Sequence, residues 1–230
     1  MAVDFRDEAP AILKDYLIYK QTIKNMSKKT VDEYFIDLRT FFRFLKVMRG
    51  LVPDGTEFDE IKIDDVDLDL IKTVNLELAY DYMNFLYRDR NNKSASRARK
   101  CSSLKGFFKY ITNNKHLLDT NPVEQLESPK NKKALPKYLT LEQSIELLNA
   151  VDGNNKQRDY CILTLFLNCG LRVSEMAGLN YNDIHSDGTM RVVGKGNKER
   201  IVYLNSACIE AYNEYMNCLL YTSDAADDRI

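Results

Sequence analysis

Apolar residues recur at helical spacing through the first half of the chain. The clearest repeat follows positions i, i+3, i+4 and i+7 over about four turns and consists of Val31, Tyr34, Phe35, Leu38, Phe41, Phe42 and Leu45. Ser27 or Thr30 is placed to cap the start of this helix, and Gly50 and Pro53 follow its end. Similar repeats predict an earlier helix around residues 13–17, a third over residues 76–87 and a fourth over residues 104–111. Together they predict a small four-helix bundle with its aromatic side chains in the core.

The pattern changes beyond residue 138. Thr140 and Gln143 have the spacing of a capping box at the start of a helix. Residues 159–169 form a strongly apolar second helix, which Gly170 ends, and a third helix begins near Arg172.

On that third helix we expect the apolar side chains Val173, Met176 and Ala177 to face the core. Apolar strands at residues 190–193 and 200–204 flank a turn at residues 194–199 and predict a β-hairpin. A last helix begins near Ser206 and keeps its period through Met216.

Charge is segregated along the chain although the formal net charge is only −1. Ten acidic residues lie between positions 54 and 81, and eight basic residues lie between positions 88 and 109. A further lysine-rich stretch around Pro129 and Pro136 has the composition of an interdomain linker. We therefore predict a helical DNA-binding domain over residues 1–120, a basic linker over 121–138 and a second domain over 139–217. A solvated helix face or a tether is the alternative interpretation of each basic run.

Several classes of protein can be set aside from composition. Five scattered cysteines and two isolated histidines give neither a disulfide framework nor metal-ligand spacing, so we expect free buried thiols and no metal. The longest apolar run, residues 161–167, is far shorter than the roughly 20 residues of a membrane span. The acidic start of the chain is unlike a secretory signal. We expect a cytoplasmic protein with no membrane partner.

Basic and hydroxyl side chains collect where two of the predicted helices begin. The free backbone N–H groups and the dipole of a helix start favour a phosphate. From these two helix starts, the linker and the hairpin we predict contacts to the DNA backbone by Lys28, Lys29, Thr30, Ser94, Ser96, Arg97, Arg99, Lys100, Lys105, Lys132, Lys133, Lys198 and Arg200. Such contacts position a protein on a duplex without reading its sequence.

Two short motifs of the second half carry the candidate chemistry. The first, Cys169-Gly-Leu-Arg-Val-Ser-Glu175, places Arg172 and Glu175 at a spacing that is usually only a surface salt bridge. The second, Gly194-Lys-Gly-Asn-Lys-Glu-Arg200, places Lys195 between two glycines. It is no phosphate-binding P-loop, because no helix follows and the lysine has no Ser or Thr neighbour. Taken alone, it is a basic loop without chemistry.

In their order, after a helical bundle and a basic linker, the two motifs resemble the tyrosine recombinases, the Xer-type and phage or transposon integrases, over roughly residues 10–217. The resemblance implies a mainly α fold with a small β-hairpin. An N-terminal four-helix SAM-like DNA-binding bundle would precede an incomplete α+β catalytic domain. Family members cleave DNA through a tyrosine that forms a 3′-phosphotyrosyl intermediate, with no metal or other cofactor.

The resemblance also assigns roles to three residues. Arg172 would bind two phosphate oxygens, Glu175 would hold the site together, and Lys195 would protonate the departing 5′-oxygen. The implied partner is double-stranded DNA, and a full-length relative would assemble as a homo- or hetero-tetramer on paired sites.

The sequence departs from the family pattern beyond the hairpin. It contains no His-x-x-Arg motif, no later His or Trp and no late tyrosine nucleophile. We therefore expect the chain as written to be inactive in DNA cleavage. Residues 218–230 lose the helical period and resemble translated adapter sequence, which suggests a truncated recombinase with a non-native tail. The alternative is a non-catalytic DNA-binding regulator derived from a recombinase. Retention of Arg172 and Lys195 favours the first interpretation.

Overall fold

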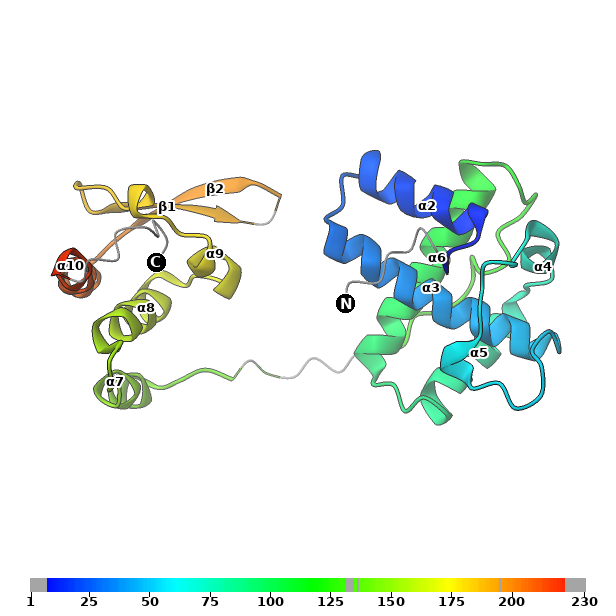
Figure 1. Cartoon of the computed structure of the whole chain (residues 1–230), viewed down its shortest axis with the longest axis horizontal. Helices are drawn as coiled ribbons and strands as arrows, with labels where there is room; N and C mark the ends of the chain where they lie inside the picture. Colours follow the sequence, from blue (N-terminus) through cyan, green and yellow to red (C-terminus); the bar gives the residue numbers. More distant parts are fainter. Residues whose placement is uncertain (1–7, 131–134, 136, 195, 222–230) are drawn as a thin grey trace. The chain divides into compact units, whose positions relative to one another are not determined.

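The chain divides into two compact units, Met1–Ala134 and Leu135–Ile230. The computed structural model describes residues 8–130, 135, 137–194 and 196–221, and Figure 1 shows the elements of each unit. The division falls within the predicted linker, whose Lys132 and Lys133 lie outside the described residues.

The first unit is helical throughout its described residues. Its elements are α2 (Ala11–Thr22), α3 (Lys28–Met48), the 3-10 helix η1 (Phe58–Glu60), α4 (Leu68–Lys72), α5 (Leu76–Arg88) and α6 (Ser94–Asn113). Helices α3 and α6 pack against each other at its centre, and α2 packs against both (Figure 1). Aromatic rings pack between these helices. The ring centroids of Phe42 and Phe107 are 5.5 Å apart, and those of Phe41 and Tyr82 are 5.1 Å apart. The prediction of aromatic residues in the core is confirmed.

Local signals set the ends of these helices. The Ser27 hydroxyl accepts a hydrogen bond from the Thr30 backbone N–H and caps α3, as predicted. At the other end Gly50 takes a left-handed φ of 64°. The Leu51 N–H then reaches the Lys46 carbonyl at 2.9 Å, which closes the helix as a Schellman motif.

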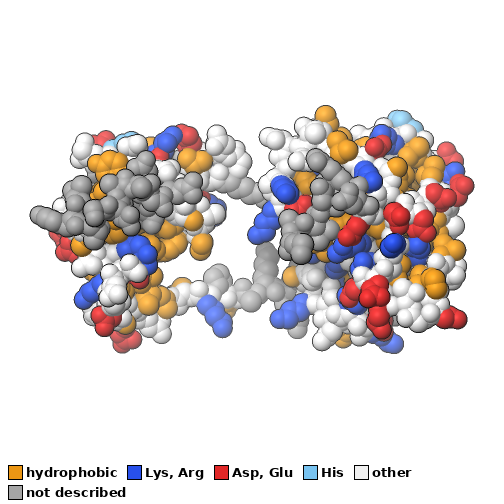
Figure 2. Space-filling model, in the orientation of Figure 1, with side chains coloured by type: hydrophobic (Ala, Val, Ile, Leu, Met, Phe, Trp, Pro, Cys, Tyr) orange, Lys and Arg blue, Asp and Glu red, His pale blue; other side chains and the backbone are white. Residues whose placement is uncertain are grey.

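Two features of the first unit differ from the prediction. The helix α4 was not foreseen, because five residues capped by Asp67 are too few to show a period. Residues 121–126 were assigned to the linker, yet Val123 and Leu126 are buried in the core of this unit. Acidic side chains are frequent over the side of the unit that carries α4 (Figure 2).

The second unit combines helices with one hairpin. Its elements are α7 (Leu141–Asn149), α8 (Lys156–Cys169), α9 (Val173–Ala177), the 3-10 helix η2 (Tyr181–Asp183), β1 (Thr189–Gly194), β2 (Lys198–Tyr203) and α10 (Ser206–Tyr221). The predicted capping box between Thr140 and Gln143 is present, and Gly170 ends α8 with a φ of 58°. The antiparallel strands pair Val192 with Arg200 and Gly194 with Lys198. A mainly α fold with a small β-hairpin is thereby confirmed.

The hairpin and the last helix are longer than predicted. Lys198 and Glu199 belong to β2 rather than to the turn, because both strands continue to the tip. Helix α10 runs through Tyr221, and Leu219 packs against the core, four residues beyond the buried Tyr215. The helical period therefore extends into residues 218–221, and residues 222–230 lie outside the described part of the chain.

The short helix α9 does not bury the side chains that periodicity suggested. Met176 is in the core, but Val173 and Ala177 are exposed, because so short a helix buries only a narrow stripe. Its third position is filled instead by Glu175, a buried carboxylate.

All five cysteines are free; Cys101, Cys161 and Cys208 are buried, and Cys169 and Cys218 are half-buried. Burial raises the pKa of the Cys161 thiol to about 12, so this thiol stays protonated. Among the described residues no helix combines the length and the apolar character needed to cross a bilayer.

Candidate functional site

A buried carboxylate in the second unit joins the start of α9 to the hairpin. The side chain of Glu175 is only 1% exposed, and each of its oxygens accepts two hydrogen bonds. Arg200 on β2 donates from Nη1 to Oε1 at 2.8 Å and from Nη2 to Oε2 at 2.9 Å. Arg172 donates from Nη1 to Oε1 at 2.7 Å and from its backbone N–H to Oε2 at 2.9 Å. This carboxylate is fully satisfied.

The pairing keeps Glu175 charged. The hydrogen bonds from Arg200 and from the Arg172 backbone hold the pKa of Glu175 well below its ordinary value of 4.5, although burial opposes them. The interpretation of Arg172 and Glu175 as a mere surface salt bridge is therefore wrong in one respect. The acidic partner is buried, and only the cation is at the surface.

Gly194 lets the hairpin approach this carboxylate. A Cβ at position 194 would lie 3.1 Å from Glu175 Oε1, which is tighter than ordinary contact. The residue has no need of a left-handed φ, in contrast to Gly196 and Asn197 at the tip, with φ values of 77° and 58°. Lys195 follows Gly194 directly in the sequence and lies outside the described residues.

The two arginines on Glu175 differ in exposure. The Arg172 side chain is 72% exposed, and among the described residues it donates only from Nη1, to Glu175. The rest of this guanidinium faces solvent and has donors for an anion. Arg200 uses both terminal nitrogens on Glu175. We predicted Arg200 as a DNA-backbone contact, but its bidentate pair with Glu175 makes it an anchor of the site.

A second carboxylate, Asp183, binds the hairpin through Arg191 of β1. Asp183 caps the backbone N–H of Asn180 at 2.9 Å and accepts from Arg191 Nε at 2.9 Å and Nη2 at 2.7 Å. Burial would raise the pKa of Asp183, but these hydrogen bonds outweigh it and lower the pKa. We did not predict the role of Asp183, although Asn180 and Asp183 have the spacing of a capping box in the sequence.

In the first unit the predicted DNA contacts at the start of α3 are available. Lys28 and Lys29 are exposed in the first turn, and within the described residues neither has an ion-pair partner. Thr30 is half-buried, and its hydroxyl hydrogen-bonds Ser27 at 2.9 Å.

The start of α6 is more mixed. Ser94 and Ser96 are half-buried in its first turn, and the Ser96 hydroxyl donates to Asn92 at 3.2 Å. The Arg97 guanidinium lies over the Tyr87 ring, 4.6 Å from its centroid, and its buried Nε has no hydrogen-bond partner among the described residues. Arg97 therefore keeps its charge free of any carboxylate there.

Two further residues of α6 serve the interior of the unit. Asp37 of α3 is fully buried; it accepts hydrogen bonds from Lys100 Nζ at 3.1 Å and from the Ser103 hydroxyl at 2.7 Å, and forms an ion pair with Arg99 Nη1 at 2.9 Å. Lys100, which we predicted as a DNA contact, is only 8% exposed. Arg99 is shared with Glu33 and remains 44% exposed.

Of the remaining predicted basic residues, Lys105 is bound within the protein and Lys198 is exposed. Lys105, also predicted as a DNA contact, is half-buried and donates to the Leu126 carbonyl at 2.8 Å, which ties residues 121–126 to α6. Lys198 is exposed at the start of β2.

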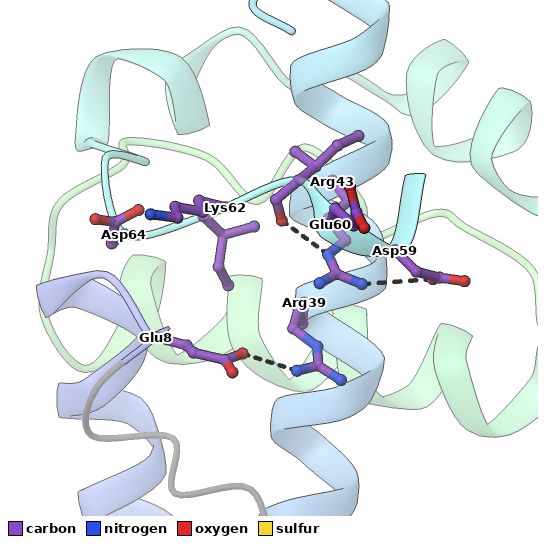
Figure 3. A pocket seen from close by; sticks show the side chains of 9 residues that line it. Glu8, Arg39, Arg43, Asp59, Glu60, Lys62 and Asp64 are labelled. Atoms are coloured by element: carbon purple, nitrogen blue, oxygen red, sulfur yellow. Dashed lines mark hydrogen bonds and ion pairs between the residues drawn. The ribbon is translucent and has the colours of Figure 1, made fainter. Parts of the chain in front are cut away.

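A pocket of about 370 Å³ in the first unit also gathers charged side chains (Figure 3). Arg39 and Arg43 project into it from α3, but Arg39 pairs with Glu8 at 2.7 Å and Arg43 with the Ile61 carbonyl at 2.9 Å. Asp59 lies 3.4 Å from Arg43. Because its arginines are compensated internally, this pocket has little attraction for a phosphate.

Comparison with known proteins accounts for both units. Residues 137–227 match the model of the phage integrase family, and residues 13–115 match that of the phage integrase N-terminal SAM-like domain. The chain is 50% identical to the tyrosine recombinase XerC of Caldanaerobacter subterraneus, covering 90% of this chain and 58% of that protein. It is 34% identical to XerC of Syntrophus aciditrophicus, covering 89% and 63%. The chain thus spans about three fifths of the length of these curated relatives.

Solved structures show the same fold. The XerH site-specific recombinase bound to a palindromic difH substrate aligns with a TM-score of 0.65 at 17% identity, over 94% of this chain and 59% of that one. A lambda integrase dimer bound to a COC′ core site aligns with a TM-score of 0.59 at 17% identity, over 88% and 68%. At this identity the likeness concerns the fold alone.

Proposed function

The chain belongs to the phage integrase family of tyrosine recombinases, and from that premise we propose that it binds double-stranded DNA and serves site-specific recombination. The observation that supports this most directly is the exposed Arg172 guanidinium held on a buried, charged Glu175. That arrangement presents a fixed cation at the surface. A phosphodiester under attack is the anion that such a cation stabilises in this family.

In this proposal the residues around Glu175 have separate tasks. Arg172 donates its free N–H groups to the non-bridging phosphate oxygens, as its fork geometry allows. Arg200 fixes the carboxylate that orients Arg172 and is a positioning residue. Lys195 acts as the general acid toward the leaving 5′-oxygen, an assignment that rests on the family motif.

The first unit supplies contacts to the DNA backbone. We assign them to Lys28, Lys29 and Arg97, which have no carboxylate partner among the described residues, with Arg99 at the edge. In the second unit Lys198 would add a contact beside the active site. Lys100, Lys105 and Arg200 are left out of the set because each of them already donates to a group within the protein.

We further propose that these 230 residues bind DNA without cleaving it, since they contain no His-x-x-Arg motif. A regulator derived from a recombinase would share that property. The preserved geometry of Arg172 favours a recombinase active site, because a protein that only binds DNA has no need of a buried carboxylate to orient one arginine.

Fluorescence anisotropy with a labelled duplex tests the proposal. The chain should bind a duplex with an affinity that falls as salt rises, because phosphate contacts release counterions. Replacing both Lys28 and Lys29 by Gln should reduce the slope of log affinity against log salt by about 1.8, two contacts at about 0.9 each. Absence of binding at low salt would contradict the proposal.

The active-site arginine is tested in the same assay. Arg172→Ala should weaken duplex binding about tenfold, the value of a charge-assisted contact. Arg158→Ala is the matched control, since Arg158 on α8 is also partly exposed and pairs only with its neighbour Asp159. Equal losses for the two variants would show a general effect of charge and would remove the special role of Arg172.

A further inference from the structure

An open apolar groove lies between the C-terminal halves of α3 and α5 in the first unit. Its volume is about 370 Å³. Phe85 lies at its centre, with its ring 5.1 Å from both Phe44 and Phe58. Val47 and Met48 line the groove and are 47% and 46% exposed. The groove therefore leaves the apolar side chains of Val47 and Met48 in contact with solvent.

Two carboxylates stand at the ends of this groove. Asp81 and Phe85 of α5 and its C-cap Asp89 all line it, and they follow one another at i, i+4 and i+8. At 1.5 Å per residue, the carboxylates are about 12 Å apart along the helix, one on each side of the aromatic centre. Both are exposed, and within the described part of the chain neither has an ion pair or a side-chain hydrogen bond. Asn84, also unpaired there, lies between them.

The charges that line the groove favour a cation over a nucleic acid, since the nearby Arg90, which lies over the Phe58 ring, is paired with Asp59. Both α3 and α5 end here, and helix C-termini carry partial negative charge. With Asp81 and Asp89 they repel phosphate and favour a cation. The apolar centre calls for an apolar side chain between two positive ones.

We propose that this groove binds a basic amphipathic helix of a protein partner. The matching helix has a large apolar residue over Phe85 and a Lys or Arg four residues before and four residues after it, opposite Asp81 and Asp89. Val47 and Met48 cover further apolar positions of that helix. The inference stands independently of DNA binding, which uses basic residues elsewhere in the chain.

A synthetic, fluorescently labelled helical peptide with this spacing is the probe. Its control peptide has the same composition, with the two lysines moved to the opposite face of the helix. Fluorescence anisotropy with the full chain should show tighter binding of the first peptide. Equal affinity for both peptides would overturn the proposal, because the spacing of the carboxylates would then carry no information.

Variants of the protein separate the two components of the groove. The double variant Asp81→Asn, Asp89→Asn should weaken binding of the first peptide about fivefold through loss of two exposed ion pairs. The matched control Asp54→Asn, Asp119→Asn removes the same charge from exposed positions outside the groove that have no ion pair among the described residues, and it should leave affinity unchanged. Equal losses for the two double variants would reduce the effect to general charge attraction and overturn the site.

Met48→Glu distinguishes docking from charge. It adds a negative charge while removing apolar surface, so it should weaken binding if the peptide docks in the groove and strengthen it if charge alone attracts the peptide. Circular dichroism should show unchanged helix content, because Met48 is half exposed. Sedimentation of the free chain covers another occupant: a dimer that Met48→Glu converts to a monomer would show that a second copy fills the groove, and would overturn the partner we propose.

Discussion

Each unit of the molecule holds a buried carboxylate between two cations, and the two clusters differ in what happens to the cations. In the first unit Asp37 binds Lys100, which is itself buried, and Arg99, which is shared with Glu33. In the second unit Glu175 binds Arg200 and leaves Arg172 72% exposed. The Asp37 cluster fastens α3 to α6, whereas the Glu175 cluster presents a cation to solvent. The difference lies in the exposed partner: Arg99, 44% exposed, is shared with a second carboxylate, Glu33, whereas Arg172 pairs with no carboxylate other than Glu175 among the described residues.

The largest effect should come from breaking the Asp37 cluster. Asp37→Ala leaves the Lys100 ammonium buried without its carboxylate and should lower the free energy of unfolding of the first unit by about 3–5 kcal/mol. Urea unfolding followed by circular dichroism measures the change. Replacing both partners, with Asp37→Ala and Lys100→Met together, should recover much of the loss. A small loss in the single variant would show that Lys100 finds water or another acceptor, and the contrast between the clusters would weaken.

The next effect separates the two arginines of the Glu175 cluster. Arg200→Ala should lower the thermal midpoint of the second unit, because it removes two of the four hydrogen bonds to a buried carboxylate. Arg172→Ala should barely change this midpoint and should weaken DNA binding instead, since most of its guanidinium faces solvent. Differential scanning calorimetry and anisotropy of the same two variants check both halves. If the variants had equal effects on stability, Arg172 would be as structural as Arg200.

The smallest effect is the expected change with pH in the stability that Glu175 contributes. Its pKa is lowered on folding, so the stability that Glu175 contributes is complete above its ordinary value of about 4.5 and declines as pH falls further. The difference in thermal midpoint between the wild type and Glu175→Gln should be largest near neutral pH and should shrink below pH 4.5. The comparison of two profiles removes the contributions of Asp183 and Asp187, whose pKa values are also lowered. A gap that stays constant with pH would show that Glu175 is not paired as described.

Most of the fold could be predicted from local signals. Ser27, Thr140 and Gly170 mark helix ends through the bonds that they make themselves or the conformations that they adopt, so their sequence context was enough. The helix α4 and the continuation of α10 were missed because a few residues give no readable period. The identity of the site residues came from two motifs and a family resemblance, not from periodicity.

What the sequence could not show was which charges meet. Lys100 and Asp37 are 63 residues apart, and Arg200 and Glu175 are 25 apart, so no local pattern pairs them. A signal for the first pair did exist. Asp37 follows Tyr34 by three residues and precedes Phe41 by four, which places it on the apolar stripe of its helix. A lone charge on an apolar stripe implies a buried partner, and Lys100, four residues before Leu104, has the same property.

The separation of acidic and basic residues in the first unit bears on kinetics as well as on affinity. Ten of its acidic residues lie between positions 54 and 81, and eight of its basic residues lie between positions 88 and 109. A body whose acidic and basic residues are segregated has an electric dipole and feels a torque in the field of a polyanion before any contact forms. The unit would therefore approach a duplex already turned, with the face that carries Asp81 and Asp89 pointing away. Productive encounters would be more frequent than the net charge of −1 suggests, and added salt would slow association by weakening that orientation.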